Sequence, residues 1–216
     1  MNAFCQDRDL LAIEPVIFFG GPAGQQLAAG TDGELDGTAF TSDTADFVAA
    51  GAAGGMVLYV YASAPEEGSA YEIVSVDSAA ALTVSVLRGD PQTAPVAPPA
   101  GSKLSFHVRT YQPQIQSVSA TLAEKLRQIA EVAGLAPAKF ADSRQLRTAA
   151  AHGALASIFV ARAHGARPID ANWIKAEHYR SLFRELQLQL RLAVDADGDG
   201  QAERTRTLGN VAMRRV

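Results

Sequence analysis

Residues 103–111, KLSFHVRTY, decide the fold class that the sequence predicts. Leu104, Phe106 and Val108 stand at every second position, and polar residues fill the positions between them. Alternation with a period of two is typical of a β-strand that has one buried and one solvent-facing side. We therefore predict a strand here, with His107 on its solvent-facing side.

Three earlier stretches have the same character: GMVLYVYAS at 55–63, AYEIVSVDS at 70–78 and ALTVSVLRG at 81–89. Each is rich in β-branched and aromatic residues and is bounded by Gly, Pro, Asp or Ser. With TAFTS at 38–42, they predict roughly five strands, enough for a small antiparallel barrel or sandwich. The proline-rich stretch 91–101 is expected to be a surface loop between the last two strands.

Beyond Pro113 the periodicity becomes helical. In TLAEKLRQIAEVAG, Thr121 and Glu124 match a capping box, so we expect a helix to begin there. A second helix, about 143–164, is rich in Ala and Gly, which lets another helix approach closely from the same chain or from a neighbour. A third helix is predicted from Asp170 to Val194, with a broad apolar face.

The N-terminal 19 residues predict a short helix that ends before Pro15. The stretch 20–37, GGPAGQQLAAGTDGELDG, is so rich in Gly and small residues that we expect a loop.

The predicted fold class is α+β: a helical body, made of the N-terminal helix and the three C-terminal helices, with the small antiparallel barrel or sandwich inserted into it. The expected divisions are an N-terminal helix and linker, a β domain, a helical domain and a C-terminal arm, at 1–29, 30–113, 114–200 and 201–216.

Charge is divided unevenly along the chain. Residues 30–102 hold ten acids and one base, a net charge of −9, whereas residues 114–216 hold fifteen Lys or Arg and ten acids, a net charge of +5. Such a split suggests two modules that face different neighbours.

Cys5 is the only cysteine, which excludes an intrachain disulfide and fits synthesis in a reducing cytoplasm. The sequence shows neither a signal peptide nor a membrane span.

No pattern in the sequence predicts an enzyme. The four histidines are dispersed, and neither a nucleophile with a paired base nor a zinc-binding motif is present. The glycine-rich stretches at 20–24 and 50–55 lack the Lys and Ser/Thr of a phosphate-binding loop. The acidic β module would repel a nucleic acid backbone. A small hydrolase with a site that sequence patterns do not reveal is the least favoured alternative.

The stretch AVDADGDGQAERTR, residues 193–206, invites comparison with a calcium-binding loop. Asp195, Asp197, Asp199 and Glu203 occupy positions 1, 3, 5 and 9 of an EF-hand loop, but position 12, which needs a bidentate Glu, is Arg206. The first interpretation is that this stretch is a polar end of the long helix and that the protein holds no cofactor. The alternative is a calcium-binding interaction module that uses these four carboxylates as ligands.

Two stretches resemble the head-to-tail connector, or adaptor, proteins of tailed bacteriophages. They are CQDRDLLAIEP at 5–15 and DANWIKAEHYRSLFRELQLQLRLAVDADGDGQAE at 170–203, the latter followed by a basic and apolar tail. The stretch from FTSDTADFVAAG at 40–51 through YEIVSVDSAAALTVSVLRG at 71–89 is similar to a small β module of phage structural proteins. The resemblance covers most of the chain in organisation.

The resemblance implies a virion protein of the phage neck that catalyses no reaction. Its partners would be the portal protein, a tail terminator or another neck protein, and sister copies in a ring, usually of twelve; genomic DNA would pass through without sequence-specific binding. No membrane is implied. In the tail, the portal-facing candidates are Leu208, Val211, Met213, Arg214 and Arg215. In the long helix, the candidates for subunit and core packing are Trp173, Tyr179, Phe183, Leu186 and Leu190. The β module departs from the simplest adaptors, and we expect it to lie on the outside of the neck.

Overall fold

The computed structural model describes residues 3–19, 26–62, 64, 67–132, 143–163, 170–194 and 204–207. The chain divides into two compact units. We call Gln6–Tyr111 the barrel unit, and Met1–Cys5 together with Gln112–Val216 the helical unit. Among the described residues, none of the helices combines the length and the apolar character needed to cross a membrane.

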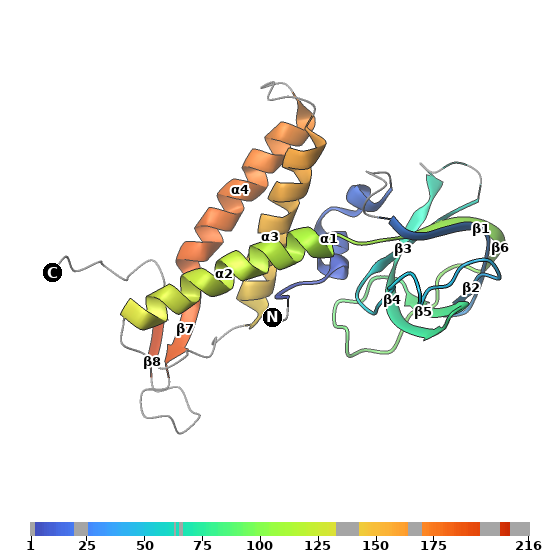
Figure 1. The fold of residues 1–216 in the computed structure, drawn as a ribbon, viewed down its shortest axis with the longest axis horizontal. Helices are drawn as coiled ribbons and strands as arrows, with labels where there is room; N and C mark the ends of the chain where they lie inside the picture. The colour runs from blue at the N-terminus through green and yellow to red at the C-terminus, as the bar shows by residue number, and fades with distance from the viewer. Residues whose placement is uncertain are drawn as a thin grey trace. The chain divides into compact units, whose positions relative to one another are not determined.

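The barrel unit contains a closed antiparallel barrel of six strands in the order β1-β2-β5-β4-β3-β6 (Figure 1). The strands are β1 (Gln26–Asp36), β2 (Ala39–Thr41), β3 (Val57–Tyr61), β4 (Ser69–Ser78), β5 (Ala81–Ser85) and β6 (Gly101–Arg109). The KLSFHVRTY stretch has a central place, because β6 pairs with β3 on one side and with β1 on the other and so closes the barrel. The interior is filled by side chains, with Phe40, Phe47 and Phe106 in mutual contact.

The predicted loop at 20–37 is wrong for most of its length, because Gln26–Asp36 forms β1, the longest strand of the barrel. Glycine is what allows this strand to close the barrel. A Cβ atom at Gly30 would lie 2.6 Å from Cε1 of Phe106, and one at Gly33 would lie 2.8 Å from Cε2 of Phe40. The aromatic rings therefore occupy the space that side chains on β1 would need. A composition that is typical of loops here serves close packing.

We expect the substitution Gly30→Val to lower the free energy of unfolding by about 1–3 kcal/mol, the usual cost of overpacking. The added side chain would collide with Phe106, although valine by itself favours a strand. Urea unfolding followed by circular dichroism measures the change. Ala29→Val is the matched control, because Ala29 is exposed on the same strand. Equal stabilities for the two variants would contradict this account of β1.

The predicted fold class is wrong in its central feature. The helix α1 (Asp7–Ile13) and the short 3-10 helix η1 (Pro15–Phe18) belong to the barrel unit and not to a helical body. The backbone of Arg8 donates to the carbonyl of Gly55 at 3.0 Å, and Tyr111 Oη donates to the carbonyl of Ile17 at 2.7 Å. The barrel with its two short helices is thus a unit in its own right and not a module inserted into a bundle.

The short helix η1 explains a second error, which concerns the outer side of β6. His107 was expected to face solvent, but it is buried, as are its neighbours Phe106 and Val108. Its Nε2 lies 3.1 Å from the carbonyl oxygen of Phe18, and its ring lies 4.9 Å from that of Tyr59. Burial, opposed by the hydrogen bond to Phe18, lowers the pKa of His107 from its ordinary value. Both sides of this part of β6 are therefore covered.

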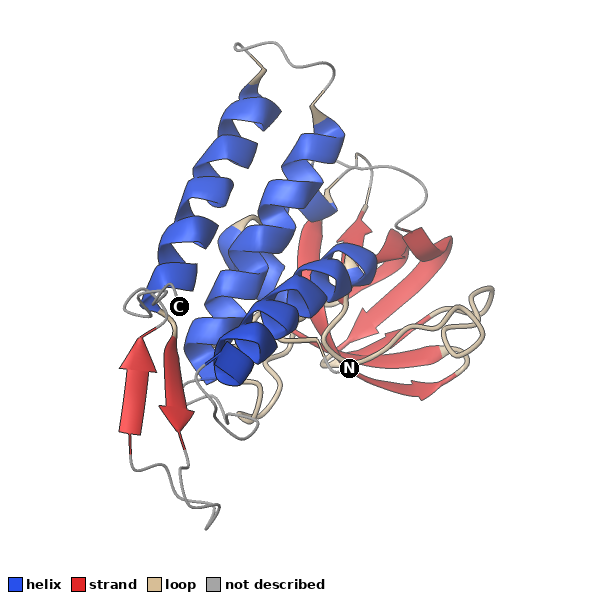
Figure 2. Ribbon diagram, turned by 60° about the vertical axis from the view of Figure 1, so that its left-hand side comes forward, coloured by secondary structure: helices blue, strands red, loops and turns tan. Residues whose placement is uncertain are grey.

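The helical unit contains α2 (Gln112–Val132), α3 (Ser143–Arg162) and α4 (Ala171–Gln189). Helices α3 and α4 lie side by side, and α2 packs against α3 (Figures 1 and 2). Helix α2 begins nine residues before the expected capping box, so Thr121 lies inside the helix, where its hydroxyl donates to the carbonyl of Ser117. Pro113 suits this earlier start, because the first turn of a helix needs no amide donor there.

The small residues of α3 serve packing within the chain. Ala149, Ala150 and Ala154 are fully buried. A Cβ atom on Gly153 would lie 2.6 Å from Val118 of α2 and 3.0 Å from Phe183 of α4. The sequence predicted that another helix would approach this one closely. Within the helical unit, both α2 and α4 do so.

Helix α4 begins as expected, because the Asp170 side chain caps it by accepting from the amide of Asn172 at 2.8 Å. It ends at Gln189, five residues earlier than predicted. The chain then forms β7 (Arg191–Val194), which pairs in antiparallel register with β8 (Arg204–Thr207), as Figure 2 shows. The end of the helix is therefore set by the start of a β-hairpin and not by the aspartate-rich stretch.

Candidate functional site

Most of the sites predicted from the sequence lie outside the described residues. This applies to the four candidate calcium ligands Asp195, Asp197, Asp199 and Glu203 and to the five portal-facing candidates Leu208, Val211, Met213, Arg214 and Arg215. The elements that flank the aspartate-rich stretch are described, and both are strands of one hairpin, whereas an EF-hand loop joins two helices. Within the described residues, no group of three or more His, Cys, Asp or Glu side chains could hold a metal ion.

The candidates for packing on α4 fall into two groups. Tyr179 and Leu190 are covered by their own chain, and the Tyr179 ring stacks on Phe159 at 5.8 Å between centroids. Trp173, Phe183 and Leu186 are only half-buried. Contact of this second group with sister subunits stays a prediction.

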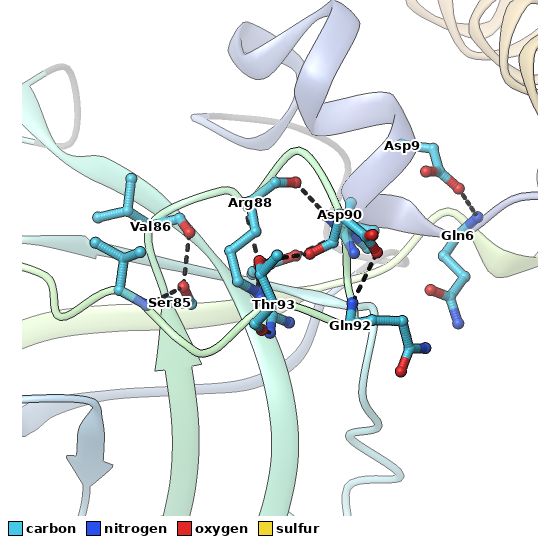
Figure 3. Close-up of polar contacts among 11 residues, drawn as sticks. Gln6, Asp9, Ser85, Val86, Arg88, Asp90, Gln92 and Thr93 are labelled. Atoms are coloured by element: carbon cyan, nitrogen blue, oxygen red, sulfur yellow. Dashed lines mark hydrogen bonds and ion pairs between the residues drawn. The ribbon is translucent and has the colours of Figure 1, made fainter.

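A buried charge cluster, which sequence reasoning missed, joins three segments of the barrel unit. Glu72 of β4 is 1% exposed, and its Oε2 lies 2.8 Å from Nε of Arg8 on α1. Its Oε1 pairs with Arg88, which lies in the loop after β5. Arg88 also donates to the carbonyl of Thr93, so the loop is held by its own arginine (Figure 3). A carboxylate between two guanidinium groups leaves no free acid or base, and we assign this cluster a structural role.

A second buried carboxylate lies at the first turn of α1. Oδ2 of Asp7 accepts from the Thr110 hydroxyl, and Oδ1 accepts from the Tyr111 amide, each at 2.7 Å. Burial raises the pKa of Asp7 from 3.8 to about 7, and the two hydrogen bonds oppose this rise. The side chain fastens α1 to the end of β6 and is enclosed by protein, so it too has a structural role.

The feature best suited to a partner is a surface groove of about 470 Å³ in the helical unit, which we call the basic groove. It is lined by residues of all three helices. They are Val118 and Lys125 of α2; Gly153, Ala156, Ser157 and Val160 of α3; and Arg180, Phe183, Arg184 and Gln187 of α4. Three of these ten residues are cations and none is an acid, so the groove has an apolar floor and a positively charged border.

The cations differ in how far their charge is already paired. Arg180 forms an ion pair with Glu177 one turn earlier and lies over the Trp173 ring. Lys125 Nζ donates at 3.0 Å to Oε1 of Gln187, a neutral group. Arg184 is exposed and has no ion pair among the described residues. Lys125 and Arg184 therefore offer positive charge that no acid among the described residues neutralises.

The groove also contains an amide without an acceptor. Nε2 of Gln187 is buried and has no hydrogen-bond partner among the described residues. Together with the cations, it makes the polar side of the groove a set of donors. Such a groove suits a partner that presents carboxylates around an apolar side chain. The i,i+4 spacing of Arg180 and Arg184 is visible in the sequence. That Lys125, 55 residues before Arg180, lies at the same groove is not.

Comparison with known protein families, with curated proteins and with solved structures finds no match to this chain.

Proposed function

We propose that this chain is a structural subunit of the neck of a tailed bacteriophage, a head-to-tail adaptor without catalytic activity. In this role it assembles into a ring on the portal, extends the DNA channel, and receives the tail or the next neck protein. The proposal starts from the resemblance of residues 5–15 and 170–203 to such proteins.

The observation that carries the proposal is the opposite charge of the two units. The barrel unit holds thirteen acids and four Lys or Arg, a net charge of −9; the helical unit holds ten acids and fifteen Lys or Arg, a net charge of +5. Opposite charges on two surfaces favour association between copies and set their orientation.

Reconstitution with a portal protein from the same genome tests the proposal. We expect native mass spectrometry and electron microscopy to show copies of the full chain bound to the portal as a closed ring. A variant that ends at Thr207 should lose portal binding, because it lacks all five portal-facing candidates. A chain that stays monomeric and never joins the portal would contradict the proposal.

A further inference from the structure

The barrel unit presents an exposed apolar side chain close in sequence to two exposed acids. We call residues 43–50, DTADFVAA, the acidic turn. Val48 in this turn is 61% exposed, and the side chains of Asp43 and Asp46 are exposed beside it in sequence. An exposed valine that follows two exposed carboxylates is the chemical counterpart of a groove that combines apolar side chains with cations.

The acidic turn is held firmly in place. Phe47 is fully buried against Phe40 and Phe106, and its amide donates to the carbonyl of Ala79 at 2.7 Å. Asp46 Oδ1 accepts from the amide of Ala49 at 2.8 Å, which caps the turn. Because the residue before Val48 is anchored in the barrel core, Val48 is fixed in an exposed position and would lose little conformational freedom on binding.

We propose that the basic groove of one copy receives the acidic turn of a second copy of this chain. Val48 would enter between Val118, Val160 and Phe183. Asp43 and the second carboxylate oxygen of Asp46 would face Lys125 and Arg184, which form no ion pair within the described part of the chain. The inference rests on the proposed function in taking a sister copy as the partner.

Two features of the groove favour a carboxylate-bearing protein over a nucleic acid. Its floor is made of aliphatic and aromatic side chains from three helices, whereas a phosphate backbone needs a polar track. One of the three cations is already paired with Glu177. The chain itself carries a fitting acidic surface on its other unit.

A contact between different surfaces of identical chains is heterologous, and repeated contacts of this kind close into a ring or extend as a filament. The acidic turn belongs to one unit and the groove to the other, so each copy has both halves of the contact. This arrangement gives the neighbouring copies of the proposed ring a defined head-to-tail order.

Sedimentation velocity of the full chain over a range of concentrations measures the association. We expect Arg184→Glu and Asp43→Lys each to raise the dissociation constant by roughly 10-fold or more, because each places like charges opposite one another. The double variant restores opposite charges and should recover much of the affinity. Arg147→Glu on α3 and Glu34→Lys on β1 are the matched controls, because both residues are exposed and lie outside the groove and the turn.

Several results would overturn the inference. One is an Arg184→Glu variant that associates as tightly as the Arg147→Glu control. Another is a double variant that recovers nothing, which would exclude the acidic turn as the occupant. A third is a groove variant that loses only binding to a DNA duplex, which would make the groove a nucleic acid site.

Portal binding separates failure of this inference from failure of the proposed function. If Arg184→Glu still forms the complete ring on the portal, the groove is not the contact between copies, and the adaptor function stands. If wild-type chain neither associates nor binds the portal, the proposed function fails as well.

Discussion

Replacing Glu72 with glutamine is expected to lower the free energy of unfolding by about 3–5 kcal/mol, the usual cost of breaking a buried ion pair from one side. The side chains of Arg8 and Arg88 are each 7% exposed, and both depend on this carboxylate. Glutamine keeps the shape but leaves two buried cations without their counter-charge. The amide also cannot accept at its nitrogen, so one of the two contacts is lost outright.

Denaturant unfolding of the full chain measures this effect, with Glu34→Gln as the control on an exposed carboxylate. Surface changes of that kind usually alter stability by no more than about 0.5 kcal/mol. A Glu72→Gln variant as stable as the control would mean that the charge cluster does not hold α1 and the loop after β5 to the barrel.

The second large effect is a change in how stability depends on pH, and it comes from Asp7. Burial raises its pKa from 3.8 to about 7 in the folded chain, so between these values the folded chain keeps a proton that the unfolded chain releases. This stabilising contribution is complete below pH 3.8 and is lost as the pH rises through 7. The loss is on the order of 4 kcal/mol.

The substitution Asp7→Asn should remove that loss, because asparagine stays neutral. Its oxygen can accept from the Tyr111 amide, and its nitrogen can donate to the Thr110 hydroxyl. We therefore expect the variant to gain stability relative to wild type as the pH rises from 4 to 8. His107 contributes a pH dependence of the opposite sign, since its lowered pKa makes acid destabilising, but it is present in both proteins and cancels in the difference. If the difference in unfolding free energy between the two proteins did not change with pH, the raised pKa of Asp7 would be contradicted.

The sequence predicted the elements whose pattern is local. Alternation identified β3 to β6, and the start of α4 at Asp170 was placed correctly because an apolar pattern of helical period begins there. β1 was missed because its glycines have a purpose only when the rings of Phe40 and Phe106 are placed against them. His107 was misjudged for a similar reason, since its cover comes from Phe18, 89 residues earlier.

The same distinction applies to the sites. Arg8, Glu72 and Arg88 form one cluster although 80 residues separate the two arginines, and no local pattern joins them. The groove needs side chains from three helices, and the acidic turn needs Phe47 in the barrel core to hold Val48 outward. The division of charge was visible in the sequence, but the surfaces that carry it were not.

Carbodiimide cross-linking tests most directly whether copies of this chain meet through their oppositely charged units. Equal amounts of ordinary and ¹⁵N-labelled full chain are mixed, treated with the reagent, which joins a carboxylate to a nearby lysine amine, and digested for mass spectrometry. We predict a cross-link between Lys125 and Asp43 or Asp46 in which light and heavy peptides are paired at random. Two results would contradict this contact between copies. One is a Lys125 cross-link that joins only light with light and heavy with heavy peptides. The other is the absence of this cross-link in chains that do associate.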